Sequence, residues 1–391
     1  MKIEASNRIK GFGGYAFAEV DKLIDELKGK GIDPIDFGVG DPTIPTPEFI
    51  RNAGKDAIEK RKSSGYPSYI GSLEFRNAVS KWIQKRFNVK IDPGKELCSN
   101  IGSKEAVFNF PEAFVNPGDY VIIPNPGYPP YERGTLFAEG KVHYTNLLVE
   151  NNFFPVLSEI PNNIAKKAKI MWINYPNSPS GKNATKKFYK EIVDFGHDNE
   201  IIIASDEAYT ELYFGEKPIS ILEVEKEGVV VINSLSKRSA MTGWRVGWLA
   251  GDENIISVYK KLKTNIDSGT PTFVQDAAIA AYSDEKHVEE MRKEYKEKRD
   301  ILVEALTGIG LDNCSPESTI YLWQKVPDGM DSVKFAKKLL DPKTAIVSTP
   351  GEWISTTANG VNPGKNYVRF ALVPSIEDTK KAAQKILDLK F

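Results

Sequence analysis

The stretch "GVVVINSLSKRSAMTGWRVG", residues 228–247, joins a short apolar run to a polar turn that holds a lysine between serines and, eight residues later, an arginine. An unbroken apolar run is typical of a strand that helices cover on both faces. In open α/β sheets, ligands bind beyond the carboxyl ends of such strands. The stretch therefore predicts a buried strand that carries Lys237 and Arg245 into a binding site.

Three earlier runs have the same unbroken apolar character: "YVIIP" at 120–124, "KIMWIN" at 169–174 and "EIIIAS" at 200–205. Residues 184–199, which precede the last of them, carry apolar side chains at helical spacing. This alternation over residues 101–250 predicts a mostly parallel sheet between helices, the signature of an α/β fold.

The pattern changes after about residue 254. A long charged helix is expected at 284–310, and strands are expected at 319–326 and 366–373, which predicts a second, smaller α+β domain. The Pro- and Gly-rich segment before residue 50 favours an extended path that crosses between domains. We expect an N-terminal segment joined to the small domain, a large α/β domain and a small C-terminal α+β domain, at residues 1–45, 46–275 and 276–391.

Charge and composition narrow the function classes. The chain has 391 residues, with 52 Lys and Arg against 53 Asp and Glu, so it has no broad basic field for nucleic acid or an anionic membrane. No apolar stretch approaches the roughly 20 residues of a membrane span. We expect a cytoplasmic protein without a secretory signal that binds small molecules. Cys98 and Cys314 are too few for a disulfide framework, and the three histidines lack metal-site spacing, so no metal is predicted.

Three familiar motifs are missing from the sequence. "GFGGYAF" at residues 11–17 lacks both the GxGxxG spacing and a preceding strand, so it does not predict a dinucleotide site. The sequence also contains no Walker GxxxxGK[ST] and no GxSxG elbow, which argues against a P-loop NTPase and an α/β-hydrolase.

Polar residues follow three of the expected strands. "YPNSPSG" follows residues 169–174, Asp206 and Tyr209 follow residues 200–205, and Lys237 follows the run that opens at residue 228. Parallel strands end at one edge of a sheet, so these groups describe one site.

Lys237 is the central candidate of this site. Partial burial disfavours its ammonium form, and the neutral amine can attack an aldehyde. A surface lysine in a polar loop is the alternative, and Lys237 alone would favour it. Arg245 with Ser234 and Ser236 changes that balance, because a guanidinium beside hydroxyls forms a cup for a phosphate. An aldehyde that carries a phosphate is pyridoxal 5′-phosphate.

Asp206 and Tyr209 then acquire roles. A buried carboxylate keeps the ring nitrogen of this cofactor protonated, as its chemistry requires. The alternative is that Asp206 caps a helix, since "DEAYTEL" could begin one. Tyr209 could reach the phenolic oxygen of the cofactor ring, or it is an ordinary half-buried tyrosine.

Four further residues have open alternatives. Ser103 and Lys104 begin an expected helix, whose free N–H groups suit a phosphate, although Ser103 could simply cap it. Tyr128 could stack on a flat ring or pack within its loop. Arg369 interrupts an apolar strand, where it either binds a substrate carboxylate or belongs to a structural ion pair.

Taken in chain order, these motifs resemble the class I and II aminotransferases of the aspartate aminotransferase fold. The resemblance covers nearly the whole chain, from "FGVGDPTIPTP" through "GYPSYIGSLEFR", "NIGSKEAVFNF" and "NYPNSPSG" to "YVRFALV". It implies pyridoxal phosphate fold type I, with a seven-stranded sheet in the large domain. It also implies amino acid and keto acid substrates and a homodimer.

The resemblance assigns a role to each matching residue. Lys237 would be the Schiff-base lysine, Asp206 the partner of the ring nitrogen and Tyr209 that of the phenolic oxygen. Tyr128 would stack on the ring beside the substrate. Arg369 and the backbone of Gly40 would bind the substrate carboxylate, and Tyr66 would reach the phosphate of the neighbouring subunit. The residues that would surround the phosphate within the subunit are Ser103, Lys104, Ser234, Ser236 and Arg245.

One position departs from the family pattern. The family reads PNNPTG, and its second asparagine binds the phenolic oxygen; here Ser178 stands at that position and Asn177 precedes it. Either Ser178 or a shifted Asn177 must take the contact.

Within the superfamily, residues 13–47 look most like the LL-diaminopimelate aminotransferases. That family makes LL-diaminopimelate from tetrahydrodipicolinate, with glutamate as the amino donor, for lysine and cell-wall synthesis. The resemblance makes Tyr15 and Lys104 candidates for the distal end of the substrate, against core packing and simple solvation as their alternatives.

We predict a transaminase in which Lys237 moves the proton as general acid and base, with ping-pong kinetics. Rival reactions on the same scaffold are those of a β-lyase, a decarboxylase, or an aspartate or aromatic aminotransferase. A rival from another class is a ligand-sensing module without catalysis.

Overall fold

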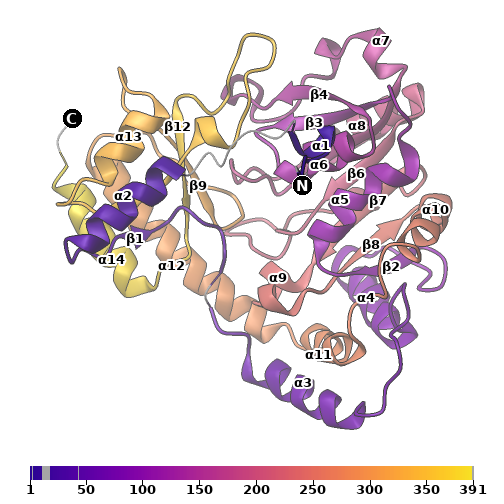
Figure 1. Ribbon diagram of the computed structural model, residues 1–391. Coiled ribbons are helices and arrows are strands. Elements are labelled where there is room, and N and C mark those ends of the chain that lie inside the picture. The colour runs from indigo at the N-terminus through magenta and orange to yellow at the C-terminus, as the bar shows by residue number, and fades with distance from the viewer. Residues whose placement is uncertain (2, 11–17, 43, 390–391) are drawn as a thin grey trace.

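A seven-stranded sheet forms the centre of the larger part of the molecule (Figure 1). The computed structural model describes residues 1, 3–10, 18–42 and 44–389. The strands, in spatial order, are β2 (Leu97–Asn100), β8 (Gly247–Gly251), β7 (Val229–Ser234), β6 (Ile202–Asp206), β5 (Ala168–Asn174), β3 (Tyr120–Asn125) and β4 (Lys141–Asn146). Within this sheet β8 alone runs opposite to the other six strands, so the predicted mostly parallel sheet is confirmed.

The strands are buried on both faces, as their unbroken apolar runs predicted. Along β3, Val121 and Ile123 pack into one core and Ile122 into the other. The first core includes helices α5 (Ser103–Phe114), α6 (Pro129–Phe137) and α10 (Glu253–Lys263), and the second includes α4 (Leu73–Phe87), α8 (Lys186–Asn199) and α11 (Thr272–Ser283). Side chains alternate between the faces of a strand, so both faces need apolar residues here.

Helices of this part begin and end at local signals. Ser72 caps α4 by accepting a hydrogen bond from the backbone N–H of Phe75, and Thr185 caps α8 by accepting one from Phe188. The helices are α1 (Asn7–Lys10), α3 (Glu48–Lys60), α4 (Leu73–Phe87), α5 (Ser103–Phe114), α6 (Pro129–Phe137), α7 (Asn162–Ala165), α8 (Lys186–Asn199), α9 (Leu235–Arg238), α10 (Glu253–Lys263) and α11 (Thr272–Ser283).

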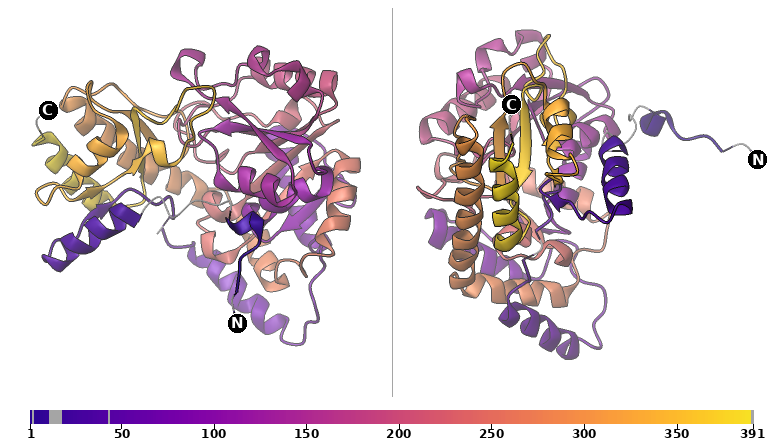
Figure 2. Two further views of the ribbon diagram at one scale, coloured as in Figure 1. Left: turned by 45° about the horizontal axis from the view of Figure 1, so that its top comes forward. Right: turned by 90° about the vertical axis from the view of Figure 1, so that its left-hand side faces the viewer.

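A three-stranded antiparallel sheet forms the smaller part, which lies beside the larger one in the left view of Figure 2. Its order is β11 (Thr349–Pro350), β12 (Tyr367–Ala371) and β9 (Tyr321–Lys325). A separate parallel pair joins the N-terminal segment to the C-terminal part through β1 (Ile35–Asp36) and β10 (Ile346–Val347). The helices here are α2 (Ala18–Gly29), α12 (Lys286–Gly308), α13 (Ser332–Leu339) and α14 (Ile376–Leu387).

The long charged helix and both C-terminal strands lie where the sequence places them, at α12, β9 and β12. The domain boundaries near residues 45 and 275 stay a prediction. Among the described residues, no helix has the length and apolar composition that crossing a membrane requires. The same residues contain no group of three or more His, Cys, Asp or Glu side chains arranged to hold a metal ion.

Candidate active site

A cavity of about 420 Å³ lies where the carboxyl ends of β6 and β7 face β9 and β12 of the smaller sheet. The sheet register sets Asn174 of β5 opposite Asp206, and Asp206 opposite Ile232 of β7, so these strand ends meet at one edge. The predicted residues that line the cavity are Gly40, Ser103, Lys104, Tyr128, Ser178, Asp206, Tyr209, Ser234, Ser236, Lys237, Arg245 and Arg369.

Lys237 projects into this cavity from α9, the short helix that begins directly after β7. Its amine Nζ donates a hydrogen bond to the carbonyl oxygen of Gly40 at 2.7 Å. Burial lowers the pKa of Lys237, and the neighbouring Arg369 and Arg245 lower it further, against the opposing effects of Tyr321 and Asp41. The neutral amine that a nucleophile or a general base requires is therefore favoured.

Asp206 ends β6 and is buried. Its Oδ2 accepts a hydrogen bond from the Tyr131 hydroxyl at 2.8 Å, and its Oδ1 accepts one from the backbone N–H of Ala208 at 3.2 Å. Burial raises the pKa of Asp206, although both hydrogen bonds oppose the rise. Turns follow β6 instead of a helix, so the capping alternative does not apply. A cationic ring N–H would offset the cost of burying this charge.

A second group of residues at the cavity can bind an anion. Helix α5 begins at Ser103 after Gly102, which offers no capping side chain, so the first-turn N–H groups stay available and Ser103 is not itself the cap. A Cβ on Gly102 would lie 2.3 Å from Nη2 of Arg245, so only glycine lets that guanidinium approach the helix start. The Ser234 hydroxyl donates to that of Ser236 at 2.9 Å beside them.

Arg369 has hydrogen-bonding capacity to spare. Its Nη2 donates to the carbonyl oxygen of Gly38 at 3.0 Å, and its guanidinium carbon lies 4.6 Å from the centre of the Tyr321 ring. Its buried Nε has no hydrogen-bond partner among the described residues. Arg369 forms no ion pair within the described part of the chain, so the alternative of a structural ion pair finds no support. A substrate in the cavity can place its carboxylate against this guanidinium.

Tyr321 is a cavity residue that the sequence analysis missed. Its hydroxyl accepts a hydrogen bond from Tyr209 at 3.2 Å. A Cβ on Gly40 would lie 2.0 Å from the Tyr321 hydroxyl oxygen, so glycine is needed for this approach. Burial acts to raise the pKa of Tyr321, but the charges of Arg369 and Lys237 outweigh burial and the pKa is lowered. Tyr321 stands in an expected strand, so the sequence did contain a signal for it. Only the pairing of β9 with β12 shows that Tyr321 and Arg369 belong to neighbouring strands of one sheet.

The loop that departs from the family pattern places its two residues differently. Ser178 lines the cavity, whereas Asn177 is buried and does not. The Asn177 Oδ1 accepts hydrogen bonds from the Ser180 backbone at 3.1 Å and the Ser180 hydroxyl at 2.6 Å. Asn177 therefore closes its own turn, and Ser178 is left to face the cavity.

Three predicted residues lie at or beyond the cavity mouth. Tyr128 is 41% exposed and meets Tyr131 edge-on, with ring centres 5.8 Å apart, and burial of its hydroxyl raises the pKa of Tyr128 to about 12. Lys104 is exposed at the rim. Tyr66 is 89% exposed and does not line the cavity. Tyr15 lies outside the described residues.

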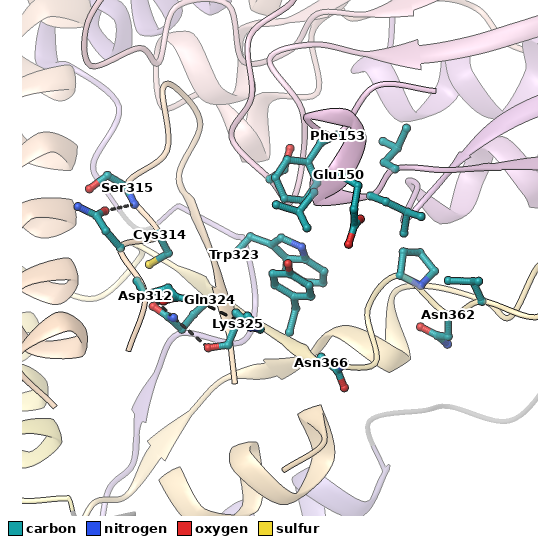
Figure 3. A pocket seen from close by; sticks show the side chains of 18 residues that line it. Glu150, Phe153, Asp312, Cys314, Ser315, Trp323, Gln324, Lys325, Asn362 and Asn366 are labelled. Atoms are coloured by element: carbon teal, nitrogen blue, oxygen red, sulfur yellow. Dashed lines mark hydrogen bonds and ion pairs between the residues drawn. The ribbon is translucent and has the colours of Figure 1, made fainter. Parts of the chain in front are cut away.

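A second cavity, of about 550 Å³, lies between residues 147–153 and the strands β9 and β12 (Figure 3). Trp323 stacks on Tyr367 there, with ring centres 5.1 Å apart. Its charged lining residues are exposed: Glu150, Asp312 and Lys325. Because the buried ionisable groups gather in the smaller cavity, that one is the candidate active site.

The donor set of the smaller cavity fits pyridoxal phosphate. A guanidinium, hydroxyls and free amides suit a phosphate, and a buried carboxylate suits a protonated ring nitrogen. An amine of lowered pKa lies in the same cavity. Arg369 remains unpaired within the described residues and can take a substrate carboxylate.

Known proteins match this chain over nearly its whole length. The sequence model of the family "Aminotransferase class I and II" matches residues 32–386. An LL-diaminopimelate aminotransferase of Aquifex aeolicus is 46% identical, and the match covers 99% of this chain and 100% of that protein. The substrate-bound BacF structure from Bacillus subtilis is 31% identical, with a TM-score of 0.90 over 99% of this chain and 98% of that one. A Thermus thermophilus aspartate aminotransferase mutant is 26% identical, with a TM-score of 0.90 over 99% of each chain.

Proposed function

Because the chain belongs to the class I and II aminotransferases, which depend on pyridoxal phosphate, we propose that it moves an amino group from glutamate to tetrahydrodipicolinate and so makes LL-diaminopimelate. The observation that supports transamination most directly is the cavity shared by Lys237, Asp206 and Arg369. The choice of substrate is supported by full-length similarity to the Aquifex aeolicus enzyme.

The predicted residues would hold five parts of the cofactor. Lys237 would bond to its aldehyde, and Asp206 would bind its ring nitrogen. Tyr209 and Ser178 would bind its phenolic oxygen, and Tyr128 would cover its ring. The phosphate would be held by Ser103, Lys104, Ser234, Ser236 and Arg245. When bound, pyridoxal phosphate supplies a ring that takes up electrons as a bond to the substrate α carbon breaks.

The side chains of this chain perform the rest of the reaction. Arg369 binds the α-carboxylate of the incoming amino acid and so fixes which bond at the α carbon breaks. Lys237 would then remove the α proton as a neutral general base. The lowered pKa of Lys237 favours that form. Beside a protonated ring nitrogen, the buried Asp206 would keep its negative charge and stabilise the positive charge of the ring.

The distal end of diaminopimelate carries a second ammonium and carboxylate. Exposed Lys104 at the cavity rim can pair with that carboxylate, and the Tyr128 hydroxyl at the mouth can bind either group. Tyr15 stays a predicted contact. These polar groups favour a long, doubly charged substrate over a purely apolar one.

A homodimer is part of the same proposal. The 89% exposed Tyr66 stands near other exposed apolar side chains in sequence, Tyr69 at 43% and Leu73 at 53%, and a second copy of the chain would cover such a patch. Tyr66 would then reach the phosphate of the neighbouring subunit. Mixing Y66A and K237A, each of which we expect to be inactive alone, tests this, because one site of each hybrid dimer holds both native residues. Activity should return on mixing, and persistent inactivity of verified hybrids argues against a shared site.

A cytosolic location is also proposed. Both cysteines, Cys98 and Cys314, are free thiols, as is usual for proteins of a reducing compartment.

The proposed reaction is tested with purified holoenzyme. Glutamate alone should yield one equivalent of 2-oxoglutarate per site, as ping-pong chemistry requires. With 2-oxoglutarate as acceptor, LL-diaminopimelate should give a kcat/KM at least about a hundredfold above aspartate or phenylalanine. A higher value for either competitor would reject the proposed substrate. Ligand binding without any 2-oxoglutarate from glutamate would favour a sensing module.

A further inference from the structure

Glu105 holds the backbone just ahead of the candidate phosphate site. It is the third residue of α5, and its Oε2 accepts a hydrogen bond from the backbone N–H of Ile101 at 3.0 Å. Its Oε1 accepts one from the Tyr259 hydroxyl at 2.9 Å. A carboxylate at this helix position that reaches back to an earlier N–H is a known way to fix a helix start. Here it fixes the turn around Gly102, which has no capping side chain of its own.

Lys263 of α10 makes this arrangement tolerable inside the protein. Its side chain is fully buried, with Nζ 3.3 Å from Oε2 of Glu105. The same nitrogen lies 2.9 and 2.8 Å from the two carboxylate oxygens of Asp267. A buried ammonium without a partner is strongly destabilising, so its pairing with these largely buried carboxylates is what permits both charges there. Glu105 keeps a fixed orientation as a result.

The turn is enclosed from the other sides as well. A Cβ on Gly102 would meet the Arg245 guanidinium, and a Cβ on Gly247 of β8 would lie 3.1 Å from the backbone nitrogen of Ser103. Ser103 lines the catalytic cavity, but Glu105 does not. Glu105 thus holds the phosphate-binding turn from behind, while Arg245 approaches it from the cavity.

We propose that Glu105, fixed by Lys263 and Tyr259, is a positioning residue that aims the first-turn amides of α5 and the Ser103 hydroxyl at the phosphate of the cofactor. The inference rests on the proposed function, because it presumes a phosphorylated cofactor in this cavity. The proposal separates the binding of the cofactor's phosphate from the binding of its ring. Glu105 affects the phosphate end, whereas Lys237 and Asp206 act on the ring.

The test compares pyridoxal phosphate with pyridoxal, which has no phosphate. The full chain is freed of cofactor, and the dissociation constant of each compound is measured for the wild type, E105A and E112A. Glu112 is an exposed residue of the same helix and serves as the matched control. E105A should raise the dissociation constant of pyridoxal phosphate by about tenfold or more, since hydrogen bonds to a charged group are involved. The dissociation constant of pyridoxal should stay within about twofold of the wild-type value. E112A should change neither.

Further variants keep the result decisive. E105Q keeps one acceptor oxygen, so it should weaken the binding of pyridoxal phosphate less than E105A does. If E105A does not fold, E105Q takes its place in the comparison. An E105A protein with a lower melting temperature but an unchanged ratio of the two dissociation constants would overturn the inference. R245A, which removes the guanidinium from the cavity, should also change that ratio. If R245A changes the ratio of the two dissociation constants and E105A does not, only the inference about Glu105 fails. If neither variant changes this ratio, the proposed cofactor site fails too.

Discussion

The amine nitrogen of Lys237 lies 2.7 Å from the carbonyl oxygen of Gly40, so the short helix after β7 is tied to the N-terminal segment that crosses between the two sheets. The same Gly40 leaves room for the Tyr321 hydroxyl, which contacts Tyr209. Residues from three distant stretches of the chain therefore converge on the candidate catalytic amine.

Replacing Arg369 should separate substrate binding from cofactor binding. R369Q removes the charge that the substrate carboxylate needs, so KM for glutamate should rise at least about thirtyfold, while cofactor affinity stays within about twofold. Steady-state kinetics and cofactor titration measure the two effects. R51K, at an exposed arginine, is the control and should behave as the wild type. An unchanged KM in R369Q would show that the substrate carboxylate binds elsewhere.

Adding one methyl group at Gly102 should loosen the phosphate end. In G102A the new Cβ would lie 2.3 Å from Nη2 of Arg245, at a φ of +70° that side chains disfavour. Gly310 has a comparable φ of +87° but no atom within 4 Å, so G310A reports backbone strain alone, about 1 kcal/mol. Both variants should lose stability, and only G102A should bind pyridoxal phosphate about tenfold more weakly. Equal cofactor affinities in the two variants would contradict the assignment.

Ser178 and Asn177 should respond differently to removal. S178A loses a hydroxyl that faces the cavity, so the pH midpoint of the visible absorbance of the bound cofactor should shift. N177A breaks the two hydrogen bonds from Ser180, so it should lower the melting temperature by several degrees. A shifted midpoint in N177A together with an unchanged one in S178A would reverse the assignment of the contact.

Glu207 should make stability fall as the pH rises. Burial raises its pKa from 4.5 to about 8, so between these values the folded state binds a proton that the unfolded state has lost. The stability that the protonated Glu207 contributes to the folded state is complete below pH 4.5 and is lost as the pH rises through about 8. E207Q mimics the neutral acid, so its free energy of unfolding relative to the wild type should grow by a few kcal/mol between pH 4 and pH 8. Urea unfolding at both values measures this, and a constant difference would refute the burial effect.

The central sheet could be predicted because its strands are buried on both faces. Four unbroken apolar runs gave β3, β5, β6 and β7. The remaining strands of the sheet were not identified from such runs, since β2 and β8 include Ser99, Asn100 and glycines, and β4 reads "KVHYTN". Their place in the sheet depends on pairing with neighbours, which apolar periodicity does not encode.

The candidate site was predictable where chemistry follows a strand end, as with Asp206 and Lys237. It was not predictable where distant residues act together. Tyr131, which donates a hydrogen bond to Asp206 from 75 positions away in the sequence, has no local signal. Tyr321 faces the cavity only because β9 pairs with β12. Such contacts come from tertiary packing, and a single sequence reveals them only through a related fold.

The central claim is that the amine of Lys237 holds the cofactor covalently. Reduction of the holoenzyme with borohydride, followed by proteolysis and mass spectrometry, tests it most directly. We predict that one reduced cofactor per chain is attached to the peptide that contains Lys237, and that K237A retains none. Attachment at another lysine, or a wild-type protein that stays unlabelled when saturated with pyridoxal phosphate, would contradict the account.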